Sequence, residues 1–83
     1  MSDEELAELV KTTLIGVAPD IEGEDFEPNE TFREQFEIDS MDFLNFVIAL
    51  NKATGVAIPE ADYPRLQILS GAVAYLKTHG AGS

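Results

Sequence analysis

The residues best placed for chemistry are Asp39, Ser40 and Asp42, which stand at the start of the apolar segment SMDFLNFVIAL, residues 40–50. A serine hydroxyl becomes a catalytic nucleophile when a neighbouring base accepts its proton. The one histidine of the chain, His79, lies near the C-terminus, and no glycine-rich oxyanion-hole motif surrounds Ser40. We therefore expect that the chain is not an enzyme on its own.

Metal and thiol chemistry are equally poorly supported by the sequence. The chain contains no cysteine, so it offers neither a thiol nucleophile nor a disulfide. The acidic residues of segment 20–30 do not have the spacing of a calcium-binding loop, and we expect no metal site. Ser40 instead stands where a helix is expected to begin, and an attached phosphate is favoured there by the positive end of the helix dipole.

Three main helices must position these residues. Hydrophobic periodicity predicts helices over residues 3–16, 39–53 and about 70–78. The first begins at a capping box formed by Ser2 and Glu5, and the second is capped by Asp39.

The remaining segments are connections. Residues 60–65 form at most a short helix, since Pro64 restricts its neighbour. Residues 18–38 form a long connection, with a helical turn near 29–35 and three phenylalanines that fix it to the core: Phe26, Phe32 and Phe36.

The fold class expected from these elements is all-α, a small bundle of three main helices plus one short helix. The long loop lies between the first two main helices. We expect a single domain over residues 1–83, with an ordered core at about 3–78 and a frayed tail at 79–83.

The second main helix carries two apolar stripes when it is plotted at about 100° per residue. The core stripe consists of Phe43, Phe46, Val47, Leu50 and Thr54. Met41, Leu44 and Ile48 form a second stripe, which we call the outer stripe, roughly 130° away. A bundle this small does not easily bury both. The outer stripe is therefore either covered by the long loop or exposed for a partner, and we favour the partner.

The charge of the chain restricts its partners. The formal net charge is −11, and most of the 16 acidic residues lie in residues 1–42. Such a field disfavours nucleic acid and anionic membranes and attracts basic protein surfaces. No apolar run approaches the roughly 20 residues of a membrane span, and the acidic N-terminus lacks the pattern of a signal peptide. We expect a monomer in the cytoplasm.

Three motifs together resemble one family. Asp39-Ser40-Met41 resembles the D-S-L motif of acyl carrier proteins, GVAIPEAD at 55–62 resembles the family's GIEIPDED, and AVAYL at 72–76 resembles AIDYI. The resemblance covers nearly the whole chain and has no gaps from about Thr31 to Leu76. The combination at these separations is far more specific than the D-S-[LM] motif alone.

This resemblance implies a carrier of acyl groups in fatty acid or lipid biosynthesis. Ser40 would hold 4′-phosphopantetheine, transferred from coenzyme A by a phosphopantetheinyl transferase, and acyl groups would be bound to its thiol as thioesters. Enzymes with basic surfaces, namely acyl-loading ligases or synthases and acyltransferases, would dock on Met41, Asp42, Leu44 and Ile48. The acyl pocket would be lined by Phe43, Phe46, Leu50 and Val73.

The chain departs from the family at several positions, which implies a specialised carrier. Glu37 stands where the family usually has glycine, two residues before the Asp-Ser pair, and Phe43 stands where a small residue is usual. A bulky ring at Phe43 fills space that a long acyl chain needs. We therefore expect short, branched or polar acyl groups that remain near the surface.

Two other functions remain open at the level of sequence. One is an acidic protein-interaction module that carries no cofactor. The other is an aminoacyl or peptidyl carrier, although those more often have a Gly-Gly-x-Ser context that this chain lacks.

Overall fold

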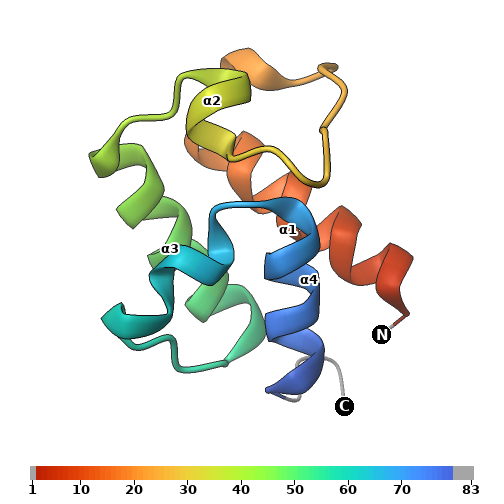
Figure 1. Cartoon of the computed structure of the whole chain (residues 1–83), viewed down its shortest axis with the longest axis vertical. Coiled ribbons are helices and arrows are strands. Elements are labelled where there is room, and N and C mark those ends of the chain that lie inside the picture. The colour runs from red at the N-terminus through yellow and green to blue at the C-terminus, as the bar shows by residue number, and fades with distance from the viewer. Residues whose placement is uncertain (1, 80–83) are drawn as a thin grey trace.

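The computed structural model describes residues 2–79 and is all-α, as the sequence predicts (Figure 1). The three main helices are present, and the long connection between the first two carries short helical segments of its own. The α-helices are α1 (Asp3–Val17), α2 (Phe32–Phe36), α3 (Ser40–Thr54) and α4 (Leu69–Thr78), and the 3₁₀ helices are η1 (Pro19–Ile21) and η2 (Glu60–Leu66). Of the predicted tail, 79–83, only His79 lies within the described residues.

Helix α1 begins at the predicted capping box. The Ser2 hydroxyl oxygen accepts from the Glu5 backbone N–H at 3.2 Å, and the Glu5 carboxylate accepts from the Ser2 N–H at 3.0 Å. The predicted end at residue 16 is one residue early, because the helix continues through Val17. Pro19, which has no backbone N–H to donate, then stops it.

The long connection is held in place by Gln35 and by the start of α4. The Gln35 amide donates to the backbone carbonyls of Glu27 and Glu30, both at 2.9 Å, and its oxygen accepts from the Glu27 N–H. The Phe32 N–H donates at 2.8 Å to the carbonyl of Gln67, which lies just before the start of α4. Phe32 is buried, as predicted, whereas Phe26 and Phe36 are half-buried against the core.

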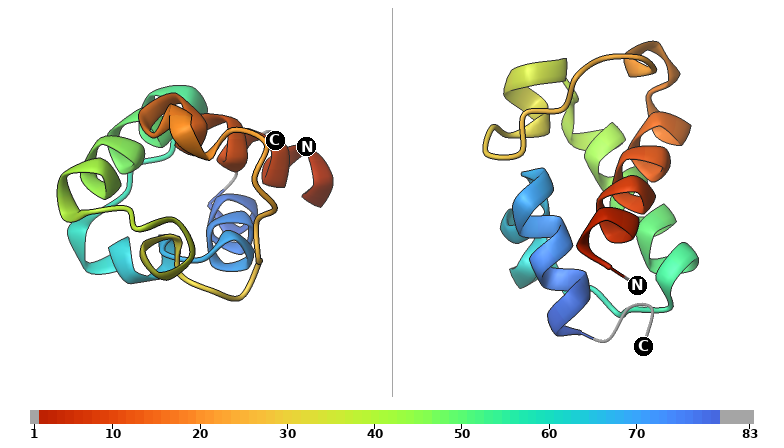
Figure 2. Two further views of the ribbon diagram at one scale, coloured as in Figure 1. Left: turned by 90° about the horizontal axis from the view of Figure 1, so that it is seen from above. Right: turned by 90° about the vertical axis from the view of Figure 1, so that its right-hand side faces the viewer.

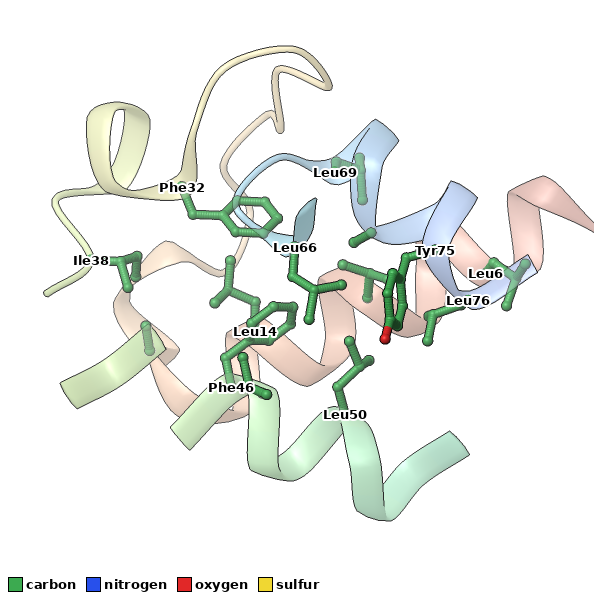
Figure 3. Close-up of a cluster of buried hydrophobic side chains, with 14 of the residues drawn as sticks. Leu6, Leu14, Phe32, Ile38, Phe46, Leu50, Leu66, Leu69, Tyr75 and Leu76 are labelled. Atoms are coloured by element: carbon green, nitrogen blue, oxygen red, sulfur yellow. The ribbon is translucent and has the colours of Figure 1, made fainter. Parts of the chain in front are cut away.

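The core forms where α1 packs against both α3 and α4, as the right-hand view of Figure 2 shows. Side chains from all three helices and from the connection meet there (Figure 3). On α4, Val73, which was expected to line an acyl pocket, is only half-buried and packs against the core. The buried face of α4 consists of Leu69, Ala72, Tyr75 and Leu76, and Val73 lies about 90° from its centre at about 100° per residue.

Candidate functional site

Ser40 is the first residue of α3, and its local structure follows from the residue before it. The Asp39 carboxylate accepts a hydrogen bond from the Asp42 backbone N–H at 2.8 Å, which caps the helix. Ser40 therefore occupies the N1 position and is exposed to solvent. An exposed hydroxyl beside free helical N–H groups is accessible to another enzyme and suited to a negatively charged substituent.

The turn into α3 depends on a residue whose backbone adopts the left-handed conformation. Glu37 ends α2 with φ 55° and ψ 35°, a conformation that glycine adopts without strain. The next residue, Ile38, is only 4% exposed and anchors the turn in the core. Glu37 keeps this geometry at a cost of roughly 1–2 kcal/mol, which a glycine at the same position would not incur.

The outer stripe of α3 is exposed. Met41 is 68% exposed, Leu44 39% and Ile48 46%, and these are the exposed large hydrophobic side chains of the described part of the chain. The opposite side of the same helix places Phe46 and Leu50 in the core with no exposed surface. Of the two arrangements considered from the sequence, the favoured one, in which the long loop leaves the outer stripe uncovered, is the one observed.

A groove of about 910 Å³ opens beside Ser40, between α2, the first turn of α3 and η2. Its volume is within the range of small-molecule sites, roughly 300–1,000 Å³. The lining residues come from three separate parts of the chain: Thr31, Phe32, Arg33, Glu34, Ile38, Asp39, Ser40, Phe43, Leu44, Glu60, Tyr63, Pro64 and Gln67.

The four residues expected to line an acyl pocket do not share one environment. Phe43 lines the groove. Phe46 and Leu50 lie in the packed core, and Val73 lies on α4 outside the groove lining. Tyr63 was not identified as a site residue from the sequence, although it lines the groove. It could have been suspected as an aromatic residue with a polar hydroxyl in the predicted short helix.

Two aromatic contacts lead from the groove to the core. The ring of Tyr63 lies edge-on to Phe43 with 6.2 Å between centroids, and Phe43 in turn lies 6.1 Å from Phe46. Phe43 is half-buried and therefore has one side toward the groove and the other toward the core.

Helix η2, which carries Tyr63, is attached to α4. The Tyr75 hydroxyl donates to the Asp62 carboxylate at 2.8 Å. Burial raises the pKa of Tyr75, and the bond to Asp62 raises it further, so the hydroxyl stays protonated and donates at neutral pH. Gly71 allows the close approach of the two helices, because a Cβ at this position would collide with the backbone carbonyl of Arg65.

Other sites receive little support from the described residues. Within residues 2–79 no group of three or more His, Cys, Asp and Glu side chains is arranged to hold a metal ion. None of the helices there combines the length and hydrophobicity that a membrane span requires. His79 stacks on Tyr75 at the far end of α4, away from the start of α3 in Figure 1.

Comparison with known proteins agrees with this geometry. The family described as the phosphopantetheine attachment site matches residues 5–76. The chain is 28% identical over 79 residues to the acyl carrier protein of Lactobacillus acidophilus, covering 95% of this chain and 98% of that protein. It is 38% identical over 48 residues to the acyl carrier protein of Lactobacillus johnsonii, covering 58% and 60% of the two chains. It is 33% identical over 52 residues to that of Rubrobacter xylanophilus, covering 63% and 64%.

Proposed function

The chain belongs to the phosphopantetheine-attachment family that includes the acyl carrier proteins, and on this premise we propose that Ser40 is its attachment residue. The chain functions as a carrier of acyl groups through a covalently attached 4′-phosphopantetheine. Its family is one of carriers rather than catalysts. The observation that supports Ser40 is the exposed N1 hydroxyl at the edge of the groove, directly followed by the outer stripe.

The residues around Ser40 fit such a group. The hydroxyl is exposed, and a phosphodiester on it would face the N-terminal N–H groups of α3. When bound, the group supplies the thiol that this chain lacks, and acyl groups are held there as thioesters. Asp39 caps the start of α3, and the buried side chain of Ile38 anchors the turn that leads to Ser40.

We propose that all bond-making steps are carried out by partner enzymes. His79 lies at the far end of α4, so it is not positioned to take the proton of the Ser40 hydroxyl. A phosphopantetheinyl transferase would supply the base, and acyl-loading ligases or synthases and acyltransferases would then act on the attached thiol. The chain contributes the hydroxyl and its presentation.

We propose that these enzymes dock on the outer stripe together with Asp42. The stripe is apolar and exposed, and it starts one residue after Ser40. An enzyme bound there would have its active site close to the 4′-phosphopantetheine, which we call the arm. The formal net charge of the chain, −11, favours enzymes with basic surfaces. A single-domain monomer in the cytoplasm is consistent with this role.

The test is to load the chain from an acyl-coenzyme A with a promiscuous transferase and to follow its intact mass. We expect an acylated adduct that loses its acyl group, but not the arm, on treatment with hydroxylamine. Ser40→Ala should give no adduct, whereas Ser70→Ala, which removes another exposed serine near a helix start, should load normally. An acyl group that resists hydroxylamine would contradict a thioester carrier.

A further inference from the structure

We propose that Tyr63 is a specificity-determining residue of this carrier. Its ring, placed against Phe43, closes the groove beside Ser40 toward the core, so the chain selects short acyl groups that carry hydrogen-bonding substituents. This inference rests on the proposed attachment at Ser40, and it concerns where the cargo lies after attachment.

The position of the two rings makes them a barrier. Phe43 and Tyr63 both line the groove that contains Ser40, and they meet edge-on at 6.2 Å. Directly behind Phe43 is Phe46, which has no exposed surface, and Leu50 follows one turn later with none. Interiors of this kind are close-packed, so a long chain that enters the core between Phe43 and Tyr63 must displace one of the two rings.

Tyr63 is held in place from both sides along the chain. The residue before it, Asp62, accepts the hydrogen bond from Tyr75 of α4. On its other side Leu66 is completely buried, and the Arg65 carbonyl lies against Gly71. Moving the Tyr63 ring away by a swing of η2 would therefore break contacts with α4. Only a rotation of the Tyr63 side chain itself is left.

The groove offers polar as well as apolar contacts to a bound group. Its lining combines apolar residues, such as Ile38 and Leu44, with the polar residues Thr31, Gln67 and Glu60. A saturated chain lying here would remove water from these polar groups without replacing its hydrogen bonds, which is unfavourable. A short acyl group with a hydroxyl or amide substituent would replace them.

The experiment uses the full chain, completely loaded with an arm that carries either a 3-hydroxybutyryl or an octanoyl group. Amide chemical shifts are then measured by NMR. Shifts are measured relative to the protein with an unacylated arm. In the unsubstituted protein we expect the 3-hydroxybutyryl group to shift the amide signals of Thr31, Tyr63 and Gln67. The octanoyl group should leave the amide signals of Phe46 and Leu50 unchanged. Tyr63→Ala should let octanoyl shift both core residues and slow hydroxylamine cleavage of its thioester several-fold. Tyr63→Phe, which keeps the ring, should behave like the unsubstituted protein.

The outcomes separate this inference from the attachment itself. Intact mass first reports whether the arm is present, and a chain without an adduct overturns the proposed attachment. If the adduct is present and octanoyl shifts Phe46 and Leu50 in the unsubstituted protein, the role of Tyr63 is overturned. This spectrum decides the question even if Tyr63→Ala does not fold. Core shifts from octanoyl in Tyr63→Phe would also overturn it.

Discussion

Helices α1 and α3 are built to the same plan and differ in what they expose. Each has 15 residues, each begins at a side-chain cap, and each buries an apolar stripe in the common core. The exposed positions of α1 carry charged or small residues: Asp3, Glu4, Glu5, Glu8, Thr12 and Gly16. The exposed positions of α3 include Met41, Leu44 and Ile48.

This difference shows which apolar residues the fold needs. One buried stripe suffices to hold α1 in the bundle, so the second stripe of α3 is not required for packing. An exposed apolar surface is unfavourable to a free monomer and is typical of sites that bind another molecule. We therefore attribute the outer stripe, which begins one residue after Ser40, to docking rather than to folding.

The largest effect is expected at Leu50 of the core stripe, in comparison with Leu44 of the outer stripe. Leu50 is fully buried and Leu44 is 39% exposed, so Leu50→Ala should lower the free energy of unfolding by about 2–5 kcal/mol. Leu44→Ala should lower it by less than about 1 kcal/mol. Urea denaturation measures both. Equal losses would mean that the outer stripe also supports the fold, and the comparison of α1 with α3 would lose its basis.

A matched pair of charge substitutions tests docking. Ile48→Asp on α3 should reduce kcat/KM for transferase loading about tenfold, because an interface anchor contributes on the order of 1–2 kcal/mol to binding. Thr12→Asp adds the same charge to an exposed position of α1 and should leave loading unchanged. A steady-state assay with coenzyme A reports both rates. A similar reduction in the two variants would point to a general effect of charge instead.

The N-caps of α1 and α3 allow the effect of stability to be separated from the effect of local structure at Ser40. Ser2→Ala and Asp39→Ala each remove a side-chain acceptor at a helix start and should each cost about 1 kcal/mol of stability. Only Asp39→Ala should also slow loading, since it alone alters the turn that holds Ser40. Thermal unfolding and the loading assay measure the two effects. If Ser2→Ala slows loading equally, stability rather than local position controls the reaction.

The smallest effect concerns the left-handed residue before the site. Glu37→Gly should stabilise the chain by about 0.5–1 kcal/mol, because glycine adopts φ 55° without the steric cost but loses more freedom on folding. Gly55→Ala, at the equivalent φ of 75° after α3, should have the opposite sign. Denaturant midpoints measure both changes. A destabilised Glu37→Gly would mean that the Glu37 side chain makes a contribution beyond its backbone.

The comparison also shows what a sequence reveals about a site of this kind. The caps at Ser2 and Asp39 and the outer stripe follow from local spacing, and all were predictable because each involves residues within one helix. The groove was not, since it joins α2, α3 and η2, and its Tyr63 wall depends on the distant contact between Asp62 and Tyr75. The burial of Ala72 in place of Val73 depends on how α4 is rotated against α1, which periodicity alone does not specify.

The central claim is that one hydroxyl, at the start of α3, carries the arm. The most direct measurement is fragment mass analysis of the chain after loading from coenzyme A, which assigns the added mass to a residue. The account predicts that the whole increment lies on Ser40, with none on Ser2 or Ser70. An increment on any other residue, or its persistence in Ser40→Ala, would contradict the account.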